Sequence, residues 1–112
     1  MITAEEYFNK GLELYHEGKC EEAIESFTKT IKLDPNYIDA YVYRGICYVN
    51  LNREEEAIQD FTKVIELKPD DAEAYLDRGM CYFNLKRHKE AINNFSKAID
   101  LCDGEDAVYL DA

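Results

Sequence analysis

Apolar residues recur at three- and four-residue spacing along most of the chain, and the whole pattern returns every 34 residues. This spacing places the apolar side chains on one face of a helix. Nine positions hold the same residue type in three successive copies, and in the middle copy they are Tyr41, Gly45, Glu56, Ala57, Ile58, Phe61, Lys63, Ile65 and Leu67. A fixed period of this length is typical of a repeat protein, in which each copy packs on its neighbours.

Each copy is predicted to fold as two amphipathic helices joined by a tight turn. The first helices are expected to end near His16, Leu51 and Leu85, and the second helices to span about residues 21–33, 54–67 and 89–101. Gly18, Asn52 and Lys86 stand in the turns, where a left-handed residue commonly follows a helix end. Glycine and asparagine adopt that conformation readily, so Lys86 is expected to cost some stability.

Short motifs ahead of the predicted helices indicate N-terminal caps. The motif is a capping residue followed three positions later by an acid, whose side chain can bond back to the cap. It occurs as Thr3-x-x-Glu6, Asn36-x-x-Asp39 and Asp70-x-x-Glu73. We therefore expect each first helix to begin just after the first residue of one of these motifs.

The ends of the second helices differ between the copies. Pro35 and Pro69 close two of them, because the residue before a proline is pushed out of the helical region. The third copy has Asp103-Gly104 instead, where we expect its second helix to end. Tyr109 then lies in register with Tyr75, so residues 106–112 predict a short C-terminal helix, either a truncated fourth repeat or a cap. Repeats at residues 4–37, 38–71 and 72–105 would form a single domain with this segment.

The charge of the chain is strongly acidic, with 24 Asp and Glu against 13 Lys and Arg and a net charge of −11. Such a surface repels phosphate backbones, so no nucleic-acid partner is expected. It favours basic or neutral partners instead. No stretch approaches the roughly 18 uninterrupted apolar residues of a membrane span, and the acidic N-terminus lacks the apolar core of a signal peptide. We therefore expect a cytoplasmic protein without a membrane segment.

Chemically reactive side chains are sparse and scattered. The four cysteines form no C-x-x-C pair and are Cys20, Cys47, Cys81 and Cys102. Two of them share one repeat position, which is typical of small core residues in a reduced compartment. His16 and His88 lie 72 residues apart at different repeat positions, so neither a metal site nor a catalytic pair is indicated. The sequence predicts no enzyme activity, no metal and no cofactor.

Several short motifs accompany the period, and together they define a resemblance. They are Gly45–Tyr48 and Gly79–Tyr82, then Ala23–Phe27, Ala57–Phe61 and Ala91–Phe95, with prolines at Pro35 and Pro69. Over residues 4 to 105 the chain resembles the tetratricopeptide repeat. The resemblance implies an all-α, right-handed superhelical solenoid of three antiparallel helix pairs. It also implies a scaffold that holds a peptide or protein in a concave groove lined by the first helix of each pair.

In that family, the second, fifth, ninth and twelfth positions of each copy face the groove, and their spacing puts them on one helix face. Here they are Glu5, Phe8, Leu12 and Tyr15, then Asp39, Val42, Ile46 and Val49, then Glu73, Leu76, Met80 and Phe83. Three acids at the rim above nine apolar side chains would form a patch that indicates a partner. Alternatively, the ninth- and twelfth-position side chains simply pack between neighbouring helices.

Some members of the family hold C-terminal carboxylates with a clamp of Lys and Asn in the groove. The corresponding positions here are Phe8, Leu12, Tyr43, Glu73 and Asp77, and none of them is basic. We therefore expect no chaperone-tail clamp. The predicted ligand is a peptide or protein segment with apolar anchors and flanking Lys or Arg.

A second hypothesis for the function is structural. The last second helix lacks a full neighbour beside Ile92, Phe95 and Ile99. This uncovered C-terminal face could stack on another copy, or on the rest of a longer repeat array. In that case the groove would be incidental, and concentration-dependent self-association would distinguish the two hypotheses.

Lys10, Arg44 and Arg78 form a basic column where the family usually has a leucine. Anion binding is one interpretation of this column. The stronger interpretation is structural, in which the alkyl stems pack and the charged ends pair with polar groups of an adjacent helix. Asp60 is the best candidate, so we predict a contact between Asp60 and Arg44 or Arg78.

Overall fold

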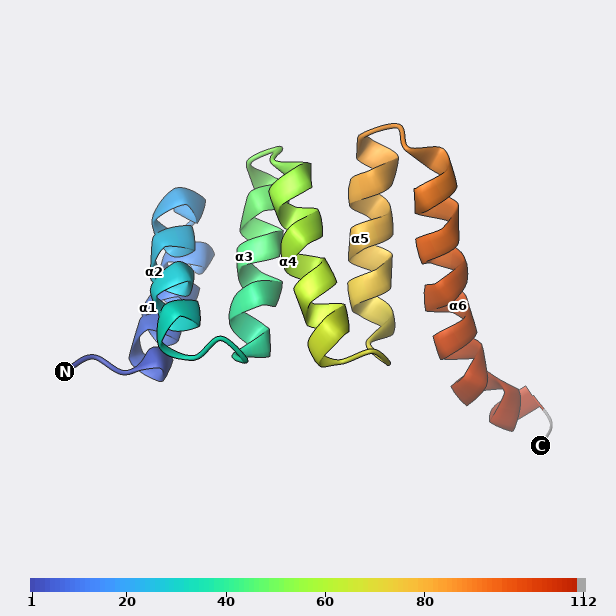
Figure 1. Ribbon diagram of the computed structural model, residues 1–112, viewed down its shortest axis with the longest axis horizontal. Helices are drawn as coiled ribbons and strands as arrows, with labels where there is room; N and C mark the ends of the chain where they lie inside the picture. Colours follow the sequence, from blue (N-terminus) through green and yellow to red (C-terminus); the bar gives the residue numbers. More distant parts are fainter. Residues whose placement is uncertain (111–112) are drawn as a thin grey trace.

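Six helices and no strands make up the chain in the computed structural model, which describes the backbone of residues 1–110 and the side chains of residues 1–102. The helices are α1 (Ala4–His16), α2 (Cys20–Leu33), α3 (Ile38–Asn50), α4 (Glu54–Leu67), α5 (Ala72–Asn84) and α6 (His88–Leu110). Consecutive helices run antiparallel and form three pairs (Figure 1). The predicted all-α fold is confirmed.

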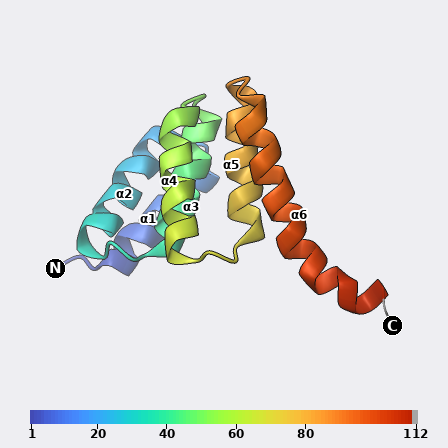
Figure 2. The same ribbon diagram turned by 45° about the vertical axis from the view of Figure 1, so that its right-hand side comes forward.

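The three pairs stack into an elongated solenoid that measures 52 × 33 × 24 Å. The second helix of each pair meets the first helix of the next, so that α3 packs on α2 and α5 packs on α4. The N-terminus and α6 lie at opposite ends of the stack (Figure 2). Since α1 also contacts α3 directly, the first helices line one side of the solenoid, where the groove is predicted.

Within a pair, the helices approach each other closely at the repeated glycine. A Cβ atom added to Gly11 would lie 2.5 Å from the ring of Phe27, and one added to Gly45 would lie 2.8 Å from the ring of Phe61. Both rings are buried, at 0% and 1% exposure. The repeated glycine and phenylalanine are therefore one feature, because the ring fills the space that the missing side chain leaves.

The turns inside the pairs contain the expected left-handed residues. The φ angle is +78° at Gly18, +60° at Asn52 and +63° at Lys86. The prediction is confirmed at all three positions. Lys86 keeps this conformation although its Cβ atom crowds the following carbonyl oxygen.

The capping predictions are confirmed for α1 and are wrong for the other two first helices. Thr3 and Glu6 form the reciprocal capping box. α3 is preceded by Tyr37, which makes no side-chain cap, and the backbone N–H of Asn36 bonds instead to the Asp34 carboxylate in the turn before it. In the third copy the cap is Asp71, one residue later than predicted, and it accepts a 3.2 Å bond from the backbone N–H of Ala74.

The predicted helix end at Asp103-Gly104 is wrong as well. α6 continues as one helix to Leu110, so the described residues form no separate short C-terminal helix, and residues 111–112 of that predicted segment lie outside them. A glycine inside a helix costs only about 1 kcal/mol. A proline would have ended the helix, because it removes a backbone donor and clashes with the preceding turn.

The predicted contact of the basic column is confirmed at Arg44. Its guanidinium donates to both oxygens of Asp60, at 2.9 and 2.7 Å, and to the hydroxyl of Thr28 at 3.2 Å. Although burial alone would lower it, the Asp60 carboxylate raises the pKa of the Arg44 guanidinium. Arg44 thus joins α3 to α2 on one side and to α4 on the other.

The third copy repeats this arrangement with a neutral partner. Arg78 donates to the amide oxygen of Asn94 at 2.7 Å and to the hydroxyl of Thr62 at 3.1 Å. Lys10 of the first copy is exposed, and its ammonium lies 4.0 Å from Glu13. Both arginines of the basic column therefore have the predicted structural role, because each bonds to the helices on either side of its own.

Candidate functional site

The predicted groove residues become more exposed along the array. Those on α1 and α3 are mostly half-buried, because the next first helix covers part of each, whereas α5 has no first helix after it. Leu76, Met80 and Phe83 on α5 are 44%, 51% and 57% exposed. The remaining exposed members are Glu5, Asp39 and Glu73, and the half-buried ones are Leu12, Tyr15, Val42, Ile46, Val49 and Asp77.

Phe8 lies in the core and is not an open groove residue, contrary to the expectation from its position. It is 8% exposed, and its ring centroid lies 4.9 Å from that of Tyr37 and 5.7 Å from that of Phe27. Tyr43 also contacts it, at 5.9 Å. The first-copy end of the groove is therefore closed by packed aromatic rings, two of which, Tyr37 and Tyr43, have no aromatic equivalent in the third copy.

An acidic hollow of about 270 Å³ opens between α3 and α5. Its apolar wall includes Val42 and Ile46, and four carboxylates line it: Asp39 from α3, Asp71 from the cap of α5, and Glu73 and Asp77 from α5. Three of these acids were expected in the groove. Asp71 was missed, because it precedes the helix and belongs to none of the repeated groove positions.

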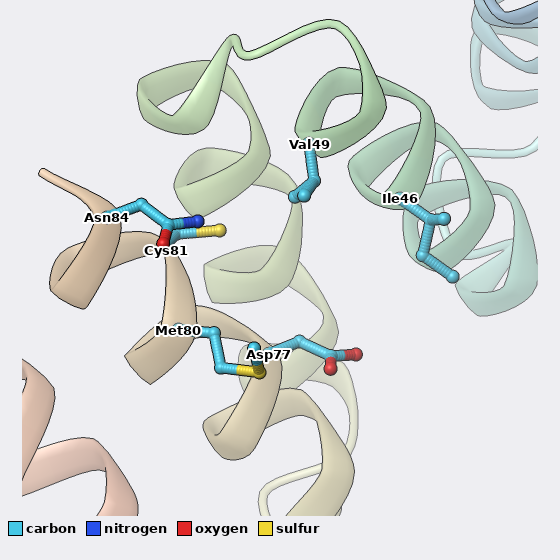
Figure 3. A pocket seen from close by; sticks show the side chains of 6 residues that line it. All are labelled: Ile46, Val49, Asp77, Met80, Cys81 and Asn84. Atoms are coloured by element: carbon cyan, nitrogen blue, oxygen red, sulfur yellow. The ribbon is translucent and has the colours of Figure 1, made fainter.

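A second hollow of about 190 Å³ continues the first one along the same two helices. Ile46 and Val49 line it from α3, and α5 contributes Asp77, Met80, Cys81 and Asn84 (Figure 3). Ile46 and Asp77 belong to both hollows. The two therefore form one continuous depression, which we call the α3–α5 groove.

Asp77 is the electrostatic centre of the α3–α5 groove. Its partial burial, together with the neighbouring charges of Glu73 and Asp71, raises the pKa of the Asp77 carboxyl to about 6. Loss of hydration and like charges both disfavour the ionised form. A cationic group placed in the hollow would relieve the repulsion among these carboxylates.

Basic side chains are scarce around this groove. Lys68 lines a shallower hollow of about 430 Å³ beside Asp39 and Asp71. The five positions that would form a carboxylate clamp are occupied by apolar, aromatic or acidic residues. The arrangement can attract cations and cover apolar side chains, and it offers little to an anion.

Other kinds of site find no geometric support in the described part of the chain. Residues 1–102 bring together no group of three or more His, Cys, Asp or Glu that could hold a metal ion. Cys20, Cys47 and Cys81 are buried free thiols, as expected for core residues, and Cys102 is exposed. Among the described helices, none is long and apolar enough to cross a membrane.

The stacked pairs and the groove define a helical repeat protein with an acidic concave site. A family model described as tetratricopeptide repeat matches residues 38–71 and 72–104, and one described as TPR repeat matches residues 11–52. Together they cover well over half of the chain. The chain therefore belongs to the tetratricopeptide repeat family, as its motifs predicted.

Individual relatives extend this likeness. The uncharacterized protein MJ0572 of Methanocaldococcus jannaschii is 41% identical over 50 residues, which cover 45% of this chain and 58% of that protein. The structure of MamA aligns with a TM-score of 0.90 at 28% identity, covering 94% of this chain and 61% of MamA. The second TPR of Spaghetti (RPAP3), solved with the HSP90 peptide SRMEEVD, aligns with a TM-score of 0.83 at 29% identity, covering 88% and 92%. The chain spans less than two thirds of the length of MJ0572 and of MamA.

Proposed function

We propose that the chain is a protein-binding module whose α3–α5 groove holds a segment with apolar anchors and flanking Lys or Arg. The observation that carries this proposal is the acidic hollow, which is lined by four carboxylates beside apolar side chains. Apolar ligand side chains would pack on Val42 and Ile46. A basic side chain beside them would meet Asp77 and Glu73.

The electrostatics favour such a ligand over an acidic one. The net charge of −11 attracts basic segments at long range and speeds their encounter. Within the groove, a Lys or Arg would pair with carboxylates that are already partly removed from water. An acidic segment would add negative charge beside Asp77, whose pKa is already raised by its partial burial and by its acidic neighbours.

The peptide-bound relative supports the use of this fold for peptide recognition. The second TPR of Spaghetti was solved with the peptide SRMEEVD, in which three of the last four residues are acidic. In the present chain, the clamp positions are Phe8, Leu12, Tyr43, Glu73 and Asp77. We therefore propose a ligand of the opposite charge in a groove of the same kind.

The exposed apolar side chains of α5 extend the proposed surface. Leu76, Met80 and Phe83 recur at four- and three-residue spacing on α5 and are all about half exposed. They could contact either an amphipathic helix or an extended strand, since both modes use regularly spaced apolar anchors. In either mode the flanking charges would fall near the acidic end of the groove.

Peptide titration followed by fluorescence anisotropy tests the proposal. Three labelled peptides share the same apolar anchors and carry flanking lysines, glutamates or serines. The lysine peptide should bind most tightly, and Ile46→Glu should weaken its binding by at least about tenfold, because a charge replaces an apolar contact. Leu33→Glu serves as the control for the added charge, since Leu33 is exposed and lies on α2, outside the groove.

Two results would contradict the proposal. One is equal or tighter binding of the glutamate peptide by the unsubstituted protein. The other is unchanged lysine-peptide binding by Ile46→Glu when circular dichroism shows that its helices are intact. Both readouts concern the groove alone and do not depend on the oligomeric state.

A further inference from the structure

The exposed apolar surface of the molecule is concentrated at its last helix pair. Eight large apolar side chains are exposed among residues 1–102, and five of them lie on α5 and α6: Leu76, Met80, Phe83, Ile92 and Ile99. Beside Ile99, a hollow of about 680 Å³ opens between these two helices. α6 forms the last layer of the stack (Figure 1), so this face has no covering helix among the described residues.

α6 presents its apolar residues at the spacing of a helix–helix seam. Ile92, Phe95, Ile99 and Cys102 follow one another at intervals of three, four and three residues, which is the a/d pattern of paired helices. The ring of Phe95 packs against Gly79 of α5 and is half-buried, so the two isoleucines form most of the open apolar surface. The equivalents of the two isoleucines on α4, Ile58 and Ile65, are half-buried in the interface with α5. Ile92 and Ile99 are instead 61% and 57% exposed.

The N-terminal face of a second copy is a poor cover for this surface. Inside the array, α3 covers α2 with Ala40 and Cys47, and both are fully buried. The equivalent positions on α1 are Glu6 and Glu13, which are exposed. Head-to-tail stacking would bury these two carboxylates against isoleucines without a partner, which is strongly unfavourable for a charged group.

The charge along α6 favours a particular orientation of a second copy. Residues 1–84 hold nine Lys and Arg against 18 Asp and Glu, whereas residues 85–112 hold four against six. Contact at this end therefore brings together the less acidic part of both molecules. The charge of the sequence also changes sign along the helix. Residues 86–89 hold three Lys and Arg, and residues 100–106 hold four acidic residues. An antiparallel pairing places opposite charges together, and a parallel one does not.

From these observations we infer that the exposed face of α6 is a dimer interface, in which α6 pairs antiparallel with α6 of a second copy. The two-fold axis passes near Phe95, so that Ile92 packs beside Ile99 of the partner subunit. The contact is isologous and closes at two copies. It uses the apolar seam of α6 and leaves the α3–α5 groove of each subunit open, so it is independent of the proposed peptide binding.

Sedimentation velocity over a range of concentrations tests this inference. The unsubstituted chain should pass from 13.0 kDa to twice that mass and stop there. Ile92→Glu and Ile99→Glu should each weaken dimerisation by at least about 100-fold, because each substitution acts twice on a two-fold interface. Leu33→Glu, at a similarly exposed leucine, should leave the dimer unchanged, and so should the groove substitution Ile46→Glu.

A charge exchange on exposed positions tests the orientation without threatening the fold. Lys89→Glu alone and Asp100→Lys alone should each weaken the dimer, and mixing the two variants should restore it, because opposite charges then meet in the antiparallel pair. A monomer at every concentration up to about 1 mM, far above the range of a stable dimer, would overturn the inference. Growth beyond the dimer, or a dimer that survives Ile99→Glu, would overturn it as well.

Discussion

Arg44 and Asp60 form a two-point ion pair across the centre of the array, with the guanidinium and carboxylate joined at 2.9 and 2.7 Å. The side chains are only 18% and 4% exposed. The third bond of Arg44 reaches Thr28 on the preceding pair. One side chain therefore connects three helices that belong to two repeats, and its loss should affect the cooperativity of the whole stack.

Asp60→Ala should lower the free energy of unfolding by about 3 kcal/mol, because it leaves Arg44 largely buried without its partner. Urea denaturation followed by circular dichroism measures the loss. Asp60→Asn is the informative comparison, since Asn94 already accepts a 2.7 Å bond from Arg78 in the third copy. It should cost less than Asp60→Ala. Equal losses in the two variants would show that the hydrogen bonds contribute little.

Gly45→Ala should destabilise the middle pair, because the new methyl group would lie 2.8 Å from the Phe61 ring. Overpacking of this kind typically costs about 1–3 kcal/mol. A double-mutant cycle with Phe61→Leu measures the clash directly by thermal denaturation. In the Phe61→Leu background, where the side chain is smaller, the glycine substitution should cost less than in the native one. Additive effects would mean that the ring moves aside without strain.

Lys86→Gly should raise the free energy of unfolding by about 0.5–1 kcal/mol. The lysine has a φ angle of +63°, a conformation that glycine adopts without the Cβ clash, although the more flexible unfolded chain offsets part of the gain. The same substitution at Lys97, an exposed lysine inside α6, is the matched control and should instead lower stability by about 1 kcal/mol. A thermal shift assay distinguishes the two directions.

The repeat pattern predicted the stacking of the helix pairs well, because each residue that recurs with the period takes part in a contact that is made in every pair. The Gly45 and Phe61 columns are the two sides of one close approach. Arg44 bonds to Thr28 and Asp60, which lie sixteen residues before and after it. Arg78 bonds at the same spacing to Thr62 and Asn94. Contacts that repeat with the period can be inferred from one sequence.

Features specific to one copy were the ones that the period could not predict. Phe8 is buried by Tyr37 and Tyr43, which have no aromatic equivalents in the third copy. Asp71 enters the acidic hollow from a helix cap whose register is shifted by one residue. The continuation of α6 past Gly104 depends on the absence of a proline, whose effect outweighs that of a glycine.

The stability of the chain should depend on pH through Asp77. The pKa of its carboxyl in the folded protein is about 6, above the ordinary value of 3.8, so folding favours the protonated form. The resulting stabilisation is fully present below about pH 4 and is lost as the pH rises through about 6. Asp77→Asn has no carboxyl to ionise, so the stability of this variant should not fall as the pH rises through about 6. At about pH 7.5 it should raise the free energy of unfolding by about 1 kcal/mol, less than the full shift implies because the side chain keeps some contact with water.

Binding of the lysine peptide should show the opposite dependence on pH, because Asp77 must ionise to pair with a cation. Raising the pH from about 5 to about 7.5 takes this carboxyl from mostly protonated to mostly ionised, so affinity should increase several-fold over this range, while the peptide lysines stay charged throughout. Asp77→Asn should bind more weakly at the upper pH and show a flatter profile, as measured by fluorescence anisotropy. A profile that Asp77→Asn leaves unchanged would place the basic side chain of the ligand away from Asp77.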